Sequence, residues 1–179
     1  MKDIYLIFKS SDIKGETRDA THAKDFAIEI SSFEHAITQP KSSSSSTAGG
    51  HTAERTEHDE MILTKDIDAA TTKLLQAISA GTVYKDVEIY FYRALGGSNT
   101  TVTSGNKRVN YLKIELKNVV ISTHKKRIVA GSELPAETVG LRYSAVRWTY
   151  NEAPLDGSTP KYTNIQGMWN LRDNTVSFA

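Results

Sequence analysis

The strongest constraint on the fold is a period-two alternation of apolar and polar residues, which recurs along most of the chain. Side chains of a β-strand point alternately to opposite faces, so this pattern predicts strands with one buried face. Many such strands in one chain predict a mainly β fold. The runs that alternate most clearly are Ile4, Leu6 and Phe8; Phe26, Ile28 and Ile30; Val87, Ile89 and Phe91; and Leu112, Ile114 and Leu116.

The last clear run changes phase partway along. It begins with Val139 and Leu141 and continues in the opposite phase through Val146 and Trp148. A one-residue phase change inside a strand marks a β-bulge or a sharp bend, which barrels and curved sheets need. We place this bend at Ser144-Ala145.

One segment has the spacing of a helix. Over residues 68–80 the apolar residues Leu74, Leu75 and Ile78 fall on one helical face. Asp68 is predicted to cap its N-terminus, and Gly81 to supply the left-handed residue after its end. Strands with one amphipathic helix predict a barrel or a compact sandwich, and 179 residues fit a single domain over 1–179.

Composition excludes several classes of protein. The chain has 22 basic and 21 acidic residues, a formal net charge of +1, so neither nucleic acid nor an anionic membrane is an expected partner. It has no cysteine, which rules out disulfides and thiolate metal sites. We expect no signal peptide and no membrane insertion, because no apolar run is long enough for either.

The motifs of catalysis and cofactor binding do not stand out. The five histidines lack metal-ligand spacing, and His22 and His35 are expected to make local hydrogen bonds. The glycine pairs form no phosphate-binding loop, and there is no nucleophile elbow. Lys125 to Arg127 form a basic cluster without the aromatic residues of a nucleic-acid site. We predict no enzyme, no metal and no cofactor.

Two polar segments interrupt the strand pattern. Residues 39–50 read QPKSSSSSTAGG, and residues 96–106 read GGSNTTVTSGN. The first lies in a connection over 38–58 that is longer than a hairpin needs, and such loops in compact domains are often functional or disordered. The charged residues from Glu54 to Glu60 then lead into the next strand.

Ordered sequence blocks over residues 3–178 resemble the Hcp family, the tube proteins of type VI secretion. No block alone is specific, but the whole set occurs in the family's order. The blocks are Ile13-Lys14-Gly15-Glu16-Thr17 with His22; Ser32-Phe33-Glu34-His35 with Gln39-Pro40 and Ser42-Ser43; Gly49 to Arg55; Lys65 to Asp68 with Lys73-Leu74 and Gly81; Tyr92-Arg93-Ala94 with Gly96-Gly97; Tyr111-Leu112; Glu133-Leu134-Pro135 with Glu137; and Tyr143 with Trp148-Thr149-Tyr150.

The resemblance implies a tight β-barrel of two antiparallel sheets with one flanking helix and a long extended loop. It also implies a homohexameric ring that stacks into a tube, carries small effector proteins, and works with a VgrG-type spike and a contractile sheath. Such a protein stays in the bacterial cytoplasm until firing and is then secreted to the extracellular space or a target cell.

The resemblance further assigns two candidate surfaces. Ser32 matches a serine of the channel wall that contacts effectors, although a bulge near Ser31-Ser32 decides which residue faces the channel. The loop over 38–58 corresponds to one that contacts the next ring. The residues expected in that contact are Gln39, Pro40, Ser43, Ser45, Gly49, Gly50, Glu54 and Arg55.

A different class of function remains open from the residues themselves. Trp148 and Trp169 have the aromatic character of sugar-binding residues. They favour, as the alternative, a monomeric β-sandwich carbohydrate-binding module. In alternating strands, however, such aromatics lie more often in the core or in interfaces. The segment from Trp169 to Leu171, with Val176, is expected to form a last edge strand.

Overall fold

The computed structural model describes residues 3–40, 55–94, 108–127, 135–154 and 158–178. These residues form eleven strands, the helix α1 (Thr71–Ala80) and a short 3-10 helix η1 (Ala23–Asp25). The strands are β1 (Asp3–Phe8), β2 (Ile28–Ile30), β3 (Ser32–Glu34), β4 (Ile37–Thr38), β5 (Glu57–His58), β6 (Met61–Asp66), β7 (Val83–Ala94), β8 (Arg108–Arg127), β9 (Ala136–Arg142), β10 (Ala145–Tyr150) and β11 (Ile165–Asn170).

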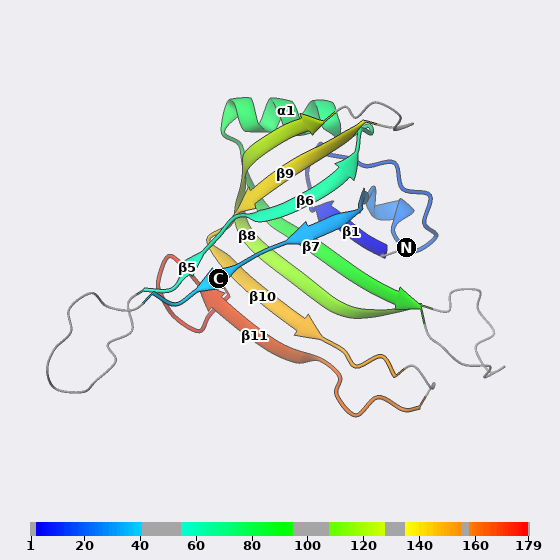
Figure 1. Cartoon of the computed structure of the whole chain (residues 1–179), viewed down its shortest axis with the longest axis vertical. Coiled ribbons are helices and arrows are strands. Elements are labelled where there is room, and N and C mark those ends of the chain that lie inside the picture. Colours follow the sequence, from blue (N-terminus) through cyan, green and yellow to red (C-terminus); the bar gives the residue numbers. More distant parts are fainter. Residues whose placement is uncertain (1–2, 41–54, 95–107, 128–134, 155–157, 179) are drawn as a thin grey trace, which may run out of the picture.

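Nine of these strands form one antiparallel sheet (Figure 1). Its order is β2-β1-β7-β8-β9-β6-β3, and β10 joins β8 and carries β11 on its other side. The two remaining strands, β4 and β5, form a separate ribbon. Helix α1 lies against β8. The predicted mainly β class with one helix is therefore confirmed, although the two sheets differ greatly in size.

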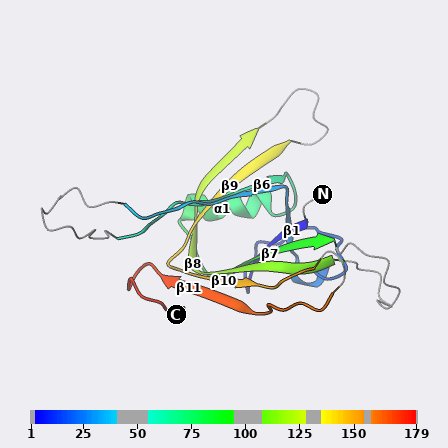
Figure 2. The ribbon, with the colours of Figure 1, turned by 60° about the horizontal axis from the view of Figure 1, so that its bottom comes forward.

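The long strand β8 bends and so turns the sheet into a curved wall. Its first half, Leu112 to Lys117, pairs with β10, and its second half, Val120 to Arg127, pairs with β9. Between the halves Asn118 adopts a left-handed φ of 49°, and the register with β9 shifts between Ile121 and Thr123. Figure 2 shows the bend, which follows from these two irregularities.

The two ends of the ladder meet through the chain itself. β2 and β3 stand at the two ends of the seven-strand order, and only Ser31 lies between them in the chain. Ile30 pairs with Ile4 of β1, whereas the Ser31 amide donates to the Thr64 carbonyl at 2.8 Å. Residues 28–34 thus pass from one end of the seven-strand order to the other. The sheet curls into a barrel, but β2 and β3 do not pair with each other, so the barrel is not closed by backbone hydrogen bonds between them.

The core confirms most of the predicted alternation. Leu6, Ile28, Ile89 and Leu116 are almost fully buried, as their runs predict. β1 is buried on both faces, because Tyr5 and Ile7 form a second small cluster with Ala27 that Tyr90 and Tyr92 cover.

The prediction for Phe26 is wrong. Phe26 is 48% exposed and ends η1 with a φ of 51°, outside the strand that begins at Ile28. The Phe26 carbonyl accepts a hydrogen bond from Gly15, and the Lys14 ammonium lies 4.5 Å from its ring centroid. Ala27 is buried in its place, since the turn shifts the alternation before β2 starts.

The predicted N-terminus of the helix is also wrong, whereas its C-terminus is confirmed. α1 begins at Thr71 after Ala70, three residues later than expected, and has no side-chain cap. The Asp68 carboxylate instead accepts hydrogen bonds from the Ala70 amide and the Lys65 ammonium, so it closes the turn before the helix. Gly81 has the expected left-handed φ of 62°.

The structure confirms the phase change near Ser144. β9 ends at Arg142 and β10 begins at Ala145, so Leu141 and Val146 are both buried although they lie an odd number of positions, five, apart. The edge strand predicted near the C-terminus exists as β11, but Val176 lies beyond it and is 75% exposed. Within the described residues, no helix has the length and apolar character needed to cross a membrane.

Candidate assembly surface

A narrow two-stranded ribbon forms the base of the predicted extended loop. Ile37 pairs with His58 and Thr38 with Glu57, and the Asp59 amide donates to the Ala36 carbonyl at 3.0 Å. Both views show β5 running out from the barrel to one side (Figures 1 and 2). Ile37 in this ribbon is 46% exposed.

The structure places only part of the predicted contact loop. Gln39 and Arg55 are exposed and Pro40 is half-buried, and the Thr56 hydroxyl donates to the Gln39 side-chain oxygen at 2.7 Å. These residues continue the ribbon past its last backbone pair. Ser43, Ser45, Gly49, Gly50 and Glu54 lie outside the described residues.

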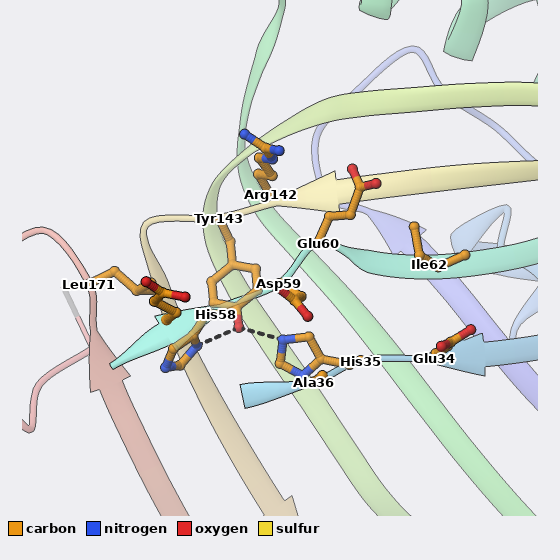
Figure 3. Close-up of a pocket in the computed structure, with 11 residues that line it drawn as sticks. Glu34, His35, Ala36, His58, Asp59, Glu60, Ile62, Arg142, Tyr143 and Leu171 are labelled. Atoms are coloured by element: carbon orange, nitrogen blue, oxygen red, sulfur yellow. Dashed lines mark hydrogen bonds between the residues drawn. The ribbon is translucent and has the colours of Figure 1, made fainter. Parts of the chain in front are cut away.

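An open pocket of about 780 Å³ lies where the ribbon leaves the barrel. Figure 3 shows its lining, which combines carboxylates, two imidazoles, a phenol and one guanidinium. The lining residues are Glu34, His35, Ala36, Glu57, His58, Asp59, Glu60, Ile62, Arg142, Tyr143 and Leu171.

Three of these side chains form a chain of hydrogen bonds across the pocket. Nδ1 of His58 lies 2.8 Å from the hydroxyl of Tyr143, and Nε2 of His35 lies 3.0 Å from the same hydroxyl (Figure 3). His35 precedes β4, His58 belongs to β5, and Tyr143 lies between β9 and β10. The trio therefore fastens both sides of the ribbon to the bend of the barrel wall.

Partial burial shifts the acid–base behaviour of this trio. Burial lowers the pKa of His35, and the neighbouring His58 lowers it further against the opposing effect of Asp59. Burial also lowers the pKa of His58 and raises that of the Tyr143 phenol. Because both imidazole pKa values fall below 6.5, both rings are neutral at pH 7. Of the two histidines expected to make local hydrogen bonds, His35 bonds Tyr143 and His22 bonds Tyr92.

Ser32 lies at the first position of β3 and is exposed. It follows an exposed Ser31, so two successive side chains face outward before Phe33 turns back toward the core. This is the break in alternation that the sequence predicts near Ser31-Ser32. Ser32 is consequently available for contact, at the seam where residues 28–34 join the two ends of the sheet.

The buried ion pair of Lys65 and Glu137 escaped the sequence analysis. Nζ of Lys65 lies 2.7 Å from a Glu137 carboxylate oxygen, and both side chains are at most 1% exposed. The signal was present in the alternation: Lys65 follows the inward-facing Met61 and Leu63, and Glu137 precedes Val139 and Leu141. Charged residues that continue an inward-facing run predict a buried pair, but only the register of β6 and β9 shows that these two meet.

An apolar patch lies at the free end of the outermost strand pair. Tyr150 of β10 stands opposite Ile165 of β11, and the Tyr162 carbonyl accepts a hydrogen bond from the Glu152 amide. Tyr150, Tyr162 and Ile165 are 42%, 59% and 52% exposed. Exposed apolar residues at an edge strand favour contact with another protein surface.

Among the described residues, no group of three or more histidine, aspartate or glutamate side chains is placed to hold a metal ion. Trp148 and Trp169 both pack against the core instead of forming an exposed stripe. The fold and the projecting ribbon define the chain as a mainly β protein with an extended two-stranded ribbon.

Comparison with known proteins gives a specific family. A family model described as "Type VI secretion system effector, Hcp" matches residues 5–150. Protein hcp1 of Pseudomonas aeruginosa is 30% identical over 169 residues, which cover 94% of this chain and 96% of that protein. The chain therefore belongs to the Hcp family of type VI secretion proteins.

Solved structures agree with this fold. A type six secretion system protein superimposes with a TM-score of 0.80 at 22% identity, covering 98% of this chain and 99% of that one. Hcp1 from Salmonella typhimurium gives a TM-score of 0.69 at 19% identity, with 97% of each chain covered. A type VI secretion system effector from Yersinia pestis gives 0.66 at 15% identity, covering 94% and 99%.

Proposed function

We propose that this chain is the structural subunit of the type VI secretion inner tube. It forms homohexameric rings that stack, carries small effector proteins in the channel, and has no catalytic activity. Its partners are further copies of itself, a VgrG-type spike and a contractile sheath. It resides in the bacterial cytoplasm until the tube is fired and then leaves the cell.

The observation that carries this proposal is the projecting β4–β5 ribbon on a member of the Hcp family. His58 contacts Tyr143 and Trp148 of the same chain, but the exposed part of the ribbon, with Ile37 and Thr38, is free to bury area against another molecule. A contact between such an extension and a different surface of the next copy is heterologous, and heterologous contacts repeat without closing into a dimer. Stacked rings need this kind of contact along the tube axis.

The distribution of charge supports a head-to-tail arrangement. Glu34, Glu57 and Asp59 are exposed around the ribbon and its pocket. The exposed Lys125, Lys126 and Arg127 end β8 opposite the start of β9, whereas the pocket takes Arg142 from the end of β9. The basic cluster thus lies at one end of β9, and the mainly acidic pocket, which also contains Arg142, lies at the other. Such a separation suits complementary faces of stacked subunits.

Native mass tests the ring directly. Light scattering on the purified protein is expected to give about 119 kDa, six times the 19.8 kDa of one chain. Electron microscopy of the same fraction is expected to show rings with a central hole. A 20 kDa particle that persists at high concentration would contradict the assembly and return attention to glycan binding.

The channel assignment of Ser32 has a separate test. Ser32→Tyr places a large side chain at an exposed position, so the mass of the ring and the unfolding midpoint are expected to stay unchanged. Capture of a co-expressed cognate effector is expected to fall. Thr72→Tyr, at an exposed position of α1, serves as a control. Equal capture by both variants would contradict a channel role for Ser32.

A further inference from the structure

The His35–Tyr143–His58 trio is built in a way that couples hydrogen bonding to proton uptake. The phenol has one hydrogen and can donate it to only one of the two ring nitrogens that face it. Its two neighbours lie 2.8 and 3.0 Å away, so one ring nitrogen must carry a hydrogen toward the phenol oxygen and the other must accept. Two neutral imidazoles satisfy this arrangement.

Two charged imidazoles do not satisfy it. An imidazolium carries a hydrogen on both nitrogens, so both rings would then donate to Tyr143 and neither could accept from it. The phenol hydrogen would lose its acceptor inside a partly buried site, and burying a polar group without a partner is unfavourable. The ring centroids of His35 and His58 are also only 6.1 Å apart, so two positive charges would repel.

Some groups around the trio favour protonation of the two imidazoles, and others oppose it. Carboxylates favour the charged rings, whereas the guanidinium of Arg142 disfavours them. The aromatic rings of Phe33 and Trp148 lie 6.4 Å from the ring of His35 and 6.5 Å from that of His58. Burial is the largest influence on both imidazoles, with Asp59 as the main opposing carboxylate at His35. The charged groups facing the site are Glu34 from β3, Glu57 from β5, Asp59 and Glu60 after β5, and Arg142 from the end of β9.

We propose that His35, Tyr143 and His58 form a proton-operated clasp, which holds the β4–β5 ribbon against the barrel while both imidazoles are neutral and releases it in acid. The effect of the clasp on assembly rests on the proposed function, in which the ribbon contacts the next ring. Acid then loosens stacking without unfolding the barrel.

The sign of the pH dependence follows from proton linkage. Each imidazole binds its proton more weakly in the clasped form than in the released form, where its pKa is near 6.5. The clasp is therefore fully stable above about pH 6.5 and weakens as the pH falls below it. Two linked protons change the clasping equilibrium by up to about a hundredfold per pH unit.

Hydrogen exchange at the ribbon tests the clasp. Protection factors are measured for the ribbon amides of 35–39 and 56–59 at pH 7.5 and 5.0, each corrected for the intrinsic exchange rate. We expect the wild-type protection to fall at least about tenfold in acid. In H35Q/H58N the amides can hydrogen-bond to the phenol but do not titrate in this range, so protection is expected to change by less than about twofold. Tyr143→Phe is expected to give low protection at both values.

His22→Gln is the matched control. Like His35 and His58, His22 has a lowered pKa and a tyrosine partner. Its partner is Tyr92, which covers the second small cluster around Tyr5 and is not part of the ribbon. This variant is expected to keep the full acid response of the ribbon. If H35Q/H58N responds to acid as the wild type does, or if the wild-type ribbon shows no response, the clasp is wrong.

A titration of the wild-type protein covers the case in which a variant does not fold. Nitrogen-15 shifts of His35 and His58 are expected to report protonation below pH 6.5, in step with the loss of ribbon protection. Titration at or above pH 6.5 would overturn the proposal. The ribbon response can be measured in unassembled chains. A pH-sensitive ribbon that never stacks therefore rejects only the proposed function, and stacking with a pH-insensitive ribbon rejects only the clasp.

Discussion

At the scale of single residues, the side chains that matter most are polar ones inside the barrel. The ammonium of Lys65 contacts Glu137, Asp68 and the Asp66 carbonyl within 2.7 Å, and the Thr71 hydroxyl donates to Glu137 at 2.8 Å. These contacts offset much of the cost of removing the charges from water, although Oε2 of Glu137 accepts no hydrogen bond from the described residues and lies 3.1 Å from Nε2 of the buried His124 side chain. This network joins β6, β9 and the first residue of α1.

Removing one member of this pair leaves a buried charge without its counter-ion. Lys65→Met is expected to lower the free energy of unfolding by about 3–5 kcal/mol. The double variant Lys65→Met, Glu137→Leu is expected to recover most of that loss, because the fully buried carboxylate is removed together with its partner and only the partly exposed Asp68 loses a counter-ion. Urea denaturation at pH 7 measures both. A loss below about 1 kcal/mol for the single variant would show that Glu137 finds another partner.

The same pair predicts how stability varies with acid. Burial alone would raise the pKa of Glu137, but hydrogen bonds from Lys65 and Thr71 outweigh it and hold the pKa below its ordinary 4.5. The stabilisation is therefore complete above about pH 4.5 and is lost as the pH falls through the lower, folded value. The slope of unfolding free energy against pH below 4.5 is expected to be steeper in the wild type than in the double variant.

At the scale of secondary structure elements, the helix shows a difference between its two ends. Its C-terminus ends at Gly81 because a residue with φ of 62° terminates the hydrogen-bond pattern, and its amide bonds back to Ala77 and Ile78. Its N-terminus depends on the Lys65 network, because Asp68 is shared between the turn and the ammonium. Local sequence determined the C-terminal end of the helix, and tertiary contacts determined its N-terminal end.

Substitution of Gly81 tests whether the backbone conformation at this residue ends the helix. A Cβ at this position would meet no atom within 4 Å, so the cost of Gly81→Ala comes from the left-handed backbone alone. We expect a loss of about 1–2 kcal/mol in unfolding free energy, and a smaller loss for Gly81→Asn. Ser79→Ala, at an exposed position of the same helix, is the control and is expected to change stability by about 0.5 kcal/mol or less. Equal losses in Gly81→Ala and the control would contradict the role of the backbone.

At the scale of the whole molecule, the barrel and the ribbon have separate roles. The barrel holds the main hydrophobic core, whereas the ribbon residues Ile37 and Glu57 are exposed. A change confined to the ribbon should therefore alter assembly and leave folding intact. The proposed tube requires this separation, because one subunit must stay folded while its extension binds the next ring.

Shortening the loop tests that separation. Replacement of residues 41–54 by an Asn-Gly turn between Pro40 and Arg55 is expected to leave the thermal midpoint within a few degrees of the wild type. Ring mass by light scattering is expected to persist, while stacked rings disappear from electron micrographs. Loss of the ring itself would place this loop within the ring interface and contradict its assignment to stacking.

The sequence by itself determined the long alternating strands, the end of the helix at Gly81 and the bend at Ser144, because each depends on residues that are neighbours in the chain. It did not predict the short strands β3, β4 and β5. It misplaced Phe26 and the start of the helix, where contacts with Gly15 and Lys65 overrode the local pattern. Only the tertiary structure decided that Lys65 meets Glu137, and that His35 and Tyr143 meet across 108 residues. Such pairs depend on strand register and on where a long strand bends, and neither is contained in the periodicity of any one segment.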